Sequence, residues 1–182
     1  MELENSTTVN SKIEVVNFKT LSKDSFAELI LENKVSLYRL SKSILKTEAD
    51  VQDAISETII KAYTNIHKLK AMNSFKPWIM KILVNECYSI IKKHKKIELT
   101  DDFTAYEGSY EDKTDDNLMF YVNQLKDEFK SVIILFYYDD ISIKNISKIL
   151  NLSEGTVKSR LSRAKVKLKV MMEENSGGDS FE

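Results

Sequence analysis

The scarcity of proline and glycine is the feature that most limits what this chain can fold into. Its 182 residues include one Pro and four Gly, too few for the tight turns that hairpins and β-sandwich corners require. The sequence therefore predicts an all-α protein. Apolar residues recur at helical spacing in two blocks, and the stretch between the blocks lacks that period. At this length we expect two small helical domains.

Composition places the boundaries of these blocks. The expected segments are a flexible extension at 1–20, a domain at 21–96, a linker at 97–116, a domain at 117–174 and a disordered tail at 175–182. The linker has eight acidic residues against one lysine, and it contains Gly108, so we expect it to be flexible and acidic. Its charge either mimics or repels nucleic acid, or it only keeps a tether soluble.

Three helical segments are expected in the first domain, at about 25–46, 47–69 and 74–96. The first segment is expected to form one helix or two, with Asn33 and Lys34 marking a bend in the second case. Thr47 followed by Asp50 resembles a capping box at the start of the second. Pro77 falls in the first turn of the third, where a missing backbone N–H costs little.

Residues 141–168 have the pattern of a helix-turn-helix. Ser142 and Ser153 stand where the two short helices begin, and Asn151 between them is able to take the left-handed turn conformation. Apolar residues of the second helix recur every three or four positions. They predict one buried stripe, made of Val157, Leu161, Ala164 and Leu168.

The opposite side of that second helix has side chains that a DNA major groove accepts. At about 100° per residue, this side presents Gly155, Thr156, Ser159, Ser162 and Arg163. Small side chains and one Arg allow close approach to base edges. Cations flank the side where phosphates would lie: Lys158, Arg160, Lys165 and Lys167. The alternative is an ordinary surface helix with a basic, solvated face.

Aromatic and basic residues share one side of the helix expected at 74–96. These residues are Trp78, Lys81, Asn85, Tyr88, Lys92 and Lys96, opposite an apolar side that includes Leu83 and Cys87. Such a stripe suits single-stranded DNA, because rings stack on unpaired bases while Lys neutralises phosphate. The alternative is that the aromatic residues only border the core.

Asp50, Asp53 and Glu57 lie on one side of the helix expected at 47–69, at spacings of three and four. They form either a solvated acidic face or a docking surface. No histidine accompanies them, and His67 and His94 lack ligand spacing, so we expect neither a metal site nor catalytic carboxylates.

We expect no enzyme activity and no cofactor, because the chain has no Gly-rich phosphate loop, nucleophile elbow or zinc motif. The single cysteine, Cys87, falls on an apolar face and reads as a core residue. Neither a signal peptide nor an apolar run of membrane-spanning length is evident, which predicts a cytoplasmic protein.

Four stretches carry a resemblance to one family over about residues 25–172. SEGTVKSRLSRAKVKL resembles region 4 of the extracytoplasmic-function (ECF) sigma factors, in the sigma-70 family. LKDEFKSVIILFYYDDIS is similar to the family's helix that leads into region 4, although Lys126 stands where Pro is common and Asp140 where Gly is common. SFKPWIMKILVNECYSIIKKHKK is similar to region 2, and DVQDAISETIIKA to region 2.2.

The resemblance implies a role for each surface. Asp50, Asp53 and Glu57 would dock on the clamp helices of RNA polymerase. The segment from Lys68 to Ser74 would receive a flipped base of the minus-10 element, in a pocket with Leu69 and Asn85. The implied minus-10 residues are Lys68, Leu69, Lys70, Asn73, Trp78, Lys81, Asn85, Tyr88, Lys92 and Lys96. The implied minus-35 residues are Thr156, Lys158, Ser159, Arg160, Ser162, Arg163 and Lys167.

The resemblance also implies partners: core RNA polymerase, promoter DNA and an anti-sigma factor, membrane-anchored in many systems, with no small-molecule substrate. It predicts an alternative sigma factor of an envelope or stress response. A self-contained helix-turn-helix regulator with a helical effector or dimerisation domain is the competing hypothesis. A helical nuclease is disfavoured because the chain lacks the acidic or metal constellation that such chemistry requires.

Overall fold

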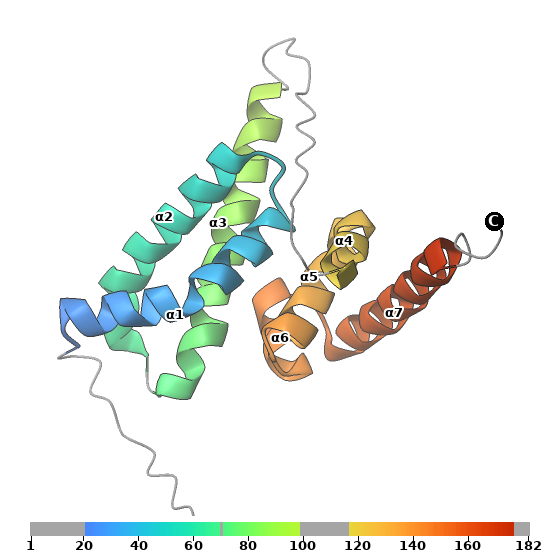
Figure 1. Ribbon diagram of the computed structural model, residues 1–182. Helices are drawn as coiled ribbons and strands as arrows, with labels where there is room; N and C mark the ends of the chain where they lie inside the picture. The colour runs from blue at the N-terminus through green and yellow to red at the C-terminus, as the bar shows by residue number, and fades with distance from the viewer. Residues whose placement is uncertain (1–20, 70, 99–116, 177–182) are drawn as a thin grey trace, which may run out of the picture.

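The computed structural model describes residues 21–69, 71–98 and 117–176, and within these ranges every regular element is a helix (Figure 1). An N-terminal unit comprises α1 (Lys23–Lys42), α2 (Glu48–Asn65), η2 (Ile66–Lys68), η3 (Met72–Ser74) and α3 (Phe75–Glu98). A C-terminal unit comprises α4 (Asn117–Gln124), α5 (Asp127–Ile133), η4 (Ile134–Tyr138), α6 (Ile143–Leu150) and α7 (Glu154–Ser176). The all-α, two-domain prediction is confirmed.

Side-chain caps start the first two helices of the N-terminal unit, α1 and α2. The Ser22 hydroxyl accepts from the Ser25 N–H at 3.1 Å, and the Thr47 hydroxyl accepts from the Asp50 N–H at 3.1 Å. Both caps satisfy an amide that has no partner within its helix. The α2 and α3 helices pack against each other, and α1 crosses them (Figure 1).

The structure decides one alternative for this unit and differs from the prediction in one detail. The first segment is a single continuous helix without a break at Asn33 and Lys34, and the buried Asn33 amide donates to the Leu29 carbonyl at 2.8 Å. That bond satisfies a polar side chain inside the helix. In addition, α2 ends at Asn65, four residues before the predicted end, and the short η2 turn follows it.

The helix-turn-helix forms as its turn chemistry predicts. Ser142 accepts from the Asn145 N–H at 3.3 Å and Ser153 from the Thr156 N–H at 3.0 Å. Asn151 has φ 54° and ψ 48°, the left-handed conformation that ends α6. Asp140, at a position where the family commonly has Gly, also has a positive φ of 52°.

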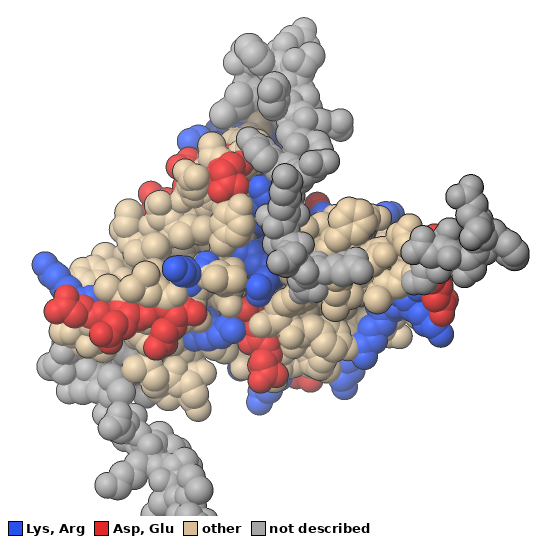
Figure 2. Space-filling view, in the orientation of Figure 1, with Lys and Arg blue, Asp and Glu red and all other residues tan. Residues whose placement is uncertain are grey.

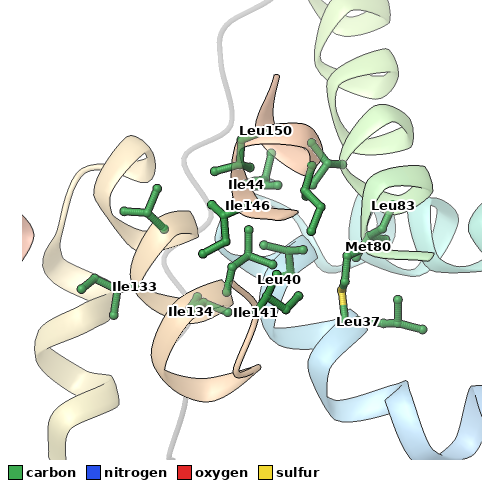
Figure 3. Packing of buried hydrophobic residues seen from close by; sticks show 14 of the residues in the cluster. Leu37, Leu40, Ile44, Met80, Leu83, Ile133, Ile134, Ile141, Ile146 and Leu150 are labelled. Atoms are coloured by element: carbon green, nitrogen blue, oxygen red, sulfur yellow. The ribbon is translucent and has the colours of Figure 1, made fainter. Parts of the chain in front are cut away.

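One hydrophobic core runs through both units. Figure 3 shows Leu37 and Leu40 of α1, and Ile44 just after its end, beside Ile141, Ile146 and Leu150 from the C-terminal unit. The α6 helix packs on α3, and η4 contacts α1. Residues 1–20, 70, 99–116 and 177–182 lie outside the described part, so the expected extension, most of the linker and the end of the tail are not placed. In the described part no helix has the length and apolar character to cross a membrane.

Candidate nucleic-acid interface

The outer side of α7 presents the small side chains that the sequence places there. Val157, Leu161, Ala164 and Leu168 are buried, which fixes the rotation of the helix. Gly155, Ser159, Ser162 and Arg163 are consequently exposed on the far side. Thr156 is half-buried, and its hydroxyl is engaged in the helix cap, where it lies 2.8 Å from the Ser153 hydroxyl.

The basic residues flanking this surface fall into two groups. Lys158 and Lys167 are exposed. The Arg160 guanidinium pairs with Glu128 at 3.1 Å, and the Lys165 ammonium lies 5.3 Å from the centre of the Tyr137 ring. Figure 2 shows Lys and Arg side chains along the lower edge of α7. Two of the four predicted flanking cations are therefore engaged within their own unit.

The aromatic and basic stripe on α3 is uneven in exposure. Lys81, Asn85, Lys92 and Lys96 are exposed, and Tyr88 is 52 % exposed. The Trp78 ring is half-buried, with its centre 6.0 Å from that of Phe75. Trp78 thus contributes to the edge of the core as well as to the surface.

Three of the predicted minus-10 residues are described in η2 and in the segment that leads from it to α3. The Lys68 ammonium donates to the Asn65 side-chain oxygen at 2.6 Å, and Leu69 is half-buried against the core. Asn73 is exposed in η3. Lys70 lies outside the described residues.

The acidic face of α2 has two exposed residues and one that is engaged by neighbouring side chains. Asp53 and Glu57 are exposed, whereas the Asp50 carboxylate accepts from the Thr47 hydroxyl at 2.8 Å and lies 3.3 Å from Nε2 of His94. The expectation that no histidine accompanies these acids was wrong. The α2 and α3 helices are antiparallel, so the start of α2 lies next to the end of α3. An antiparallel pair of helices could have been expected from the sequence, and it would have placed His94 near Asp50.

Two ionisable groups have clearly shifted pKa values in the described part of the chain. Burial raises the pKa of the Cys87 thiol to about 12, so it is not a nucleophile at neutral pH. The hydrogen bond from Lys42 lowers the pKa of the partly buried Glu48 carboxyl. No group of three or more His, Cys, Asp or Glu that could hold a metal ion occurs in the described ranges.

Two apolar grooves were missed at the sequence level. A groove of about 610 Å³ lies between α4, η4 and α7, with Leu118, Tyr137 and Met172 in its lining. A second, of about 400 Å³, lies between α1 and α2 and includes Val35 and Ile59. Neither could be found from one helix, because each takes its lining from elements brought together by the fold.

Comparison with known proteins agrees with both halves of this arrangement. Residues 29–97 match the family model for sigma-70 region 2, and residues 115–168 match the model for sigma-70 region 4. The N-terminal unit therefore contains sigma-70 region 2, and the C-terminal unit contains sigma-70 region 4.

Curated relatives and solved structures give the same result. The chain is 31 % identical over 149 residues to the RNA polymerase sigma factor SigV of Bacillus subtilis, covering 80 % of this chain and 90 % of that protein. It is 28 % identical over 143 residues to the ECF RNA polymerase sigma factor SigM of the same organism, covering 74 % and 87 %. The sigma factor RpoE, in its complex with the anti-sigma factor NepR from Bartonella quintana, has the same fold, with a TM-score of 0.72 at 23 % identity over 84 % of this chain and 98 % of that one. The chain belongs to the ECF group of sigma-70 RNA polymerase sigma factors.

Proposed function

We propose that this alternative sigma factor binds promoter DNA at two places, with α7 in the major groove of the minus-35 element and α3 on the melted minus-10 element. The domain division underlying this proposal is 21–96 and 117–174. The outer side of α7 is the observation that supports it most. Gly155, Ser159 and Ser162 are small and exposed, so they leave room for the helix in a major groove about 12 Å wide.

The same side of α7 supplies both kinds of contact that DNA recognition requires. Arg163 is able to make a bidentate contact to a guanine, and Lys158 and Lys167 lie at the flanks, where phosphates run. On α3, the exposed Tyr88 ring, the half-buried Trp78 ring and the exposed lysines suit unpaired bases and their backbone. Bond formation is assigned to the core polymerase, and this chain contributes recognition only.

Run-off transcription with core RNA polymerase and a promoter library tests the proposal. We expect defined transcripts that need both the chain and core polymerase. The competing hypothesis, a self-contained helix-turn-helix regulator, predicts tight binding of a palindromic duplex by the chain alone and no dependence on it for initiation.

Polymerase docking is assigned to the acidic face of α2. Reversing the charge of both exposed acids, Asp53→Lys with Glu57→Lys, is expected to weaken binding to core by about 1 to 2 kcal/mol, or roughly tenfold in Kd. The reversal removes two attractions and adds two repulsions. Helicity should be retained, because Lys is a good helix former. Titration of labelled chain with core polymerase gives the Kd.

The matched control reverses Glu28 and Glu32, which are exposed on α1 at the same spacing of four. Equal weakening by both double variants would assign the effect to net charge and remove the α2 face from the docking surface.

We further propose that an anti-sigma factor binds this chain in the cytoplasm, either soluble or membrane-anchored, and releases it in an envelope or stress response. The two apolar grooves support this, because exposed apolar surface of this kind commonly marks a protein interface. The two fold neighbours point the same way, since one is described in complex with the anti-sigma factor NepR and CnrH in complex with the cytosolic domain of CnrY.

Affinity capture from cells before and after envelope stress tests this second proposal. A stoichiometric partner should be captured at rest, be replaced by polymerase after stress and compete with polymerase in vitro. Capture of polymerase alone under both conditions contradicts it.

A further inference from the structure

An apolar groove of about 400 Å³ lies between α1 and α2 on the N-terminal unit. Its lining includes Ile30, Lys34 and Val35 of α1, together with Ile55 and Ile59 of α2. Val35 is 54 % exposed, although it is an apolar side chain among apolar neighbours. A contiguous apolar surface of this kind marks a place where another segment or molecule binds.

An apolar segment of the same chain is tethered to the start of α1. Residues 12–19, with the sequence KIEVVNFK, lie outside the described part of the structure. Between two lysines they carry four apolar side chains: Ile13, Val15, Val16 and Phe18. Two positions after this segment, Leu21 is half-buried and packs against the core. The segment therefore begins two residues from a fixed point beside α1.

The reach of this segment matches the position of the groove. The α1 residues of the groove lie 7 to 15 positions after Lys23, which at about 1.5 Å per residue is about 10 to 23 Å along the helix. Residues 13–18 precede Leu21 by three to eight positions. An extended chain covers about 3.4 Å per residue, so these residues reach about 10 to 27 Å from Leu21. A chain that turns back near Thr20 and runs antiparallel to α1 would bring their side chains over the groove.

The charges of α1 are complementary to those of the segment in this orientation. Three acids are exposed on α1 at spacings of four, in a region where Figure 2 shows acidic side chains gathered: Asp24, Glu28 and Glu32. Lys19 would lie opposite the first of these acids. Farther along, Glu14 would come within side-chain reach of Lys34, which is exposed where it lines the groove. Exposed ion pairs are weak, so these would set the orientation, and burial of apolar surface would supply the affinity.

We propose that residues 12–19 bind back onto the N-terminal unit, antiparallel to α1, with their apolar side chains in the groove between α1 and α2. The tether favours this occupant over a separate molecule, because a segment joined by a few residues is present at a millimolar effective concentration. A second protein that uses this groove must displace the segment. Ile55 and Ile59 share α2 with Asp53 and Glu57, so the bound segment lies on the same helix as the acidic face to which polymerase docking is assigned.

Paramagnetic broadening of methyl signals tests this proposal in the full chain. A nitroxide attached to Ser11→Cys marks the far end of the segment, and the buried Cys87 will not be labelled. In chain with isotope-labelled isoleucine, the methyl signals of Ile55 and Ile59 should lose intensity, and reduction of the nitroxide should restore it. The signal of Ile133, in the core of the C-terminal unit, should keep its intensity.

A charge swap tests the orientation of the segment. Lys34→Glu should restore part of the intensity of the two groove signals, because Glu14 then faces an acid. Glu14→Lys in the same chain should remove that intensity again. Lys46→Glu makes the same change of charge at an exposed position outside the groove, and it should leave the broadening as it is.

Replacement of apolar residues tests the source of the affinity. Val15→Asn with Val16→Asn should restore the signals of Ile55 and Ile59 in full, because burial of an amide without a partner is unfavourable. The matched control, Thr7→Asn with Thr8→Asn, changes two residues outside the segment and should leave the broadening unchanged.

A mixed sample distinguishes the segment of the same chain from that of a second copy. Spin-labelled chain without isotope is mixed with isotope-labelled chain without a nitroxide, and no broadening is expected. Broadening in this mixture would assign the groove to a second copy and overturn the proposal. Full intensity of Ile55 and Ile59 in the doubly labelled chain would also overturn it and leave the groove to another protein. Neither polymerase nor DNA is present, so failure here leaves the proposed function standing.

Discussion

Leu40→Ala is expected to lower the free energy of unfolding of the whole chain by about 2 to 5 kcal/mol. Leu40 has no exposed surface, and it lies in α1 where the cores of the two units meet (Figure 3). Truncation to Ala removes its apolar contacts and leaves a cavity that neighbours on both sides cannot fill without moving. Because the core is shared, both units should lose stability together.

Urea denaturation measures this effect with two probes. Fluorescence of Trp78, the single tryptophan, reports on the N-terminal unit, and far-ultraviolet circular dichroism reports on helices of both units. Coincident transitions indicate one cooperative structure. The matched control is Leu31→Ala in the same helix, where the side chain is 61 % exposed and a loss under about 0.5 kcal/mol is expected.

Separate transitions by the two probes would show that the units unfold independently, and an equal, small loss for both Leu variants would remove Leu40 from a shared core.

The helices of this protein could be predicted because their signals are local. Thr47, Ser142 and Ser153 cap the helices that follow them, and Asn151 takes the left-handed turn. Each signal involves groups within about four residues, so one sequence is enough to read it. The buried stripe of α7 follows from spacing alone, and the exposed side opposite it follows from the stripe.

The contacts between the units could not be predicted in this way. Asp139 lies in a polar pair with Asp140 before the helix-turn-helix, which reads as a solvated turn. Its burial depends on α1, which contacts η4, and on Lys76 of α3, whose ammonium lies 3.3 Å from an Asp139 oxygen although it stands 63 positions earlier in the chain. The choice between one helix and two at Asn33 could not be made from the sequence for a related reason, because a polar residue in a buried position is satisfied by its own helix.

In the candidate site, too, the local features could be predicted and the contacts between distant segments could not. Which side of α7 faces outward was readable, but the engagement of Arg160 by Glu128 was not, because α5 brings that acid from 32 positions earlier in the chain. Arg163 and Lys167 also lie on the predicted surface of α7. The fold does not require either of them to form an ion pair of the kind that Arg160 forms with Glu128. They therefore carry the sharper test of base recognition and phosphate contact.

Arg163→Ala is expected to cost about 1 to 3 kcal/mol of binding to the preferred minus-35 sequence, a loss of roughly 5- to 150-fold, if Arg163 contacts a guanine. The loss should be selective. A promoter variant that lacks the guanine should bind the wild type and Arg163→Ala alike, because the bidentate contact is absent in both. Holoenzyme binding and run-off transcription across a set of minus-35 variants measure this difference.

Lys167→Ala is the matched control, since Lys167 is an exposed cation at the flank of the same helix. It should weaken binding to all variants alike and lower the salt dependence of the affinity, as expected for a phosphate contact. Gly155, Ser159 and Ser162 place few atoms between α7 and the bases, so a guanidinium at position 163 is long enough to supply most of the discrimination. If Arg163→Ala instead weakens every sequence equally, Arg163 binds phosphate, and base recognition falls to the hydroxyls of Ser159 and Ser162. If it changes nothing on any variant, Arg163 lies outside the DNA interface, and α7 enters the groove with a different side than the buried stripe implies.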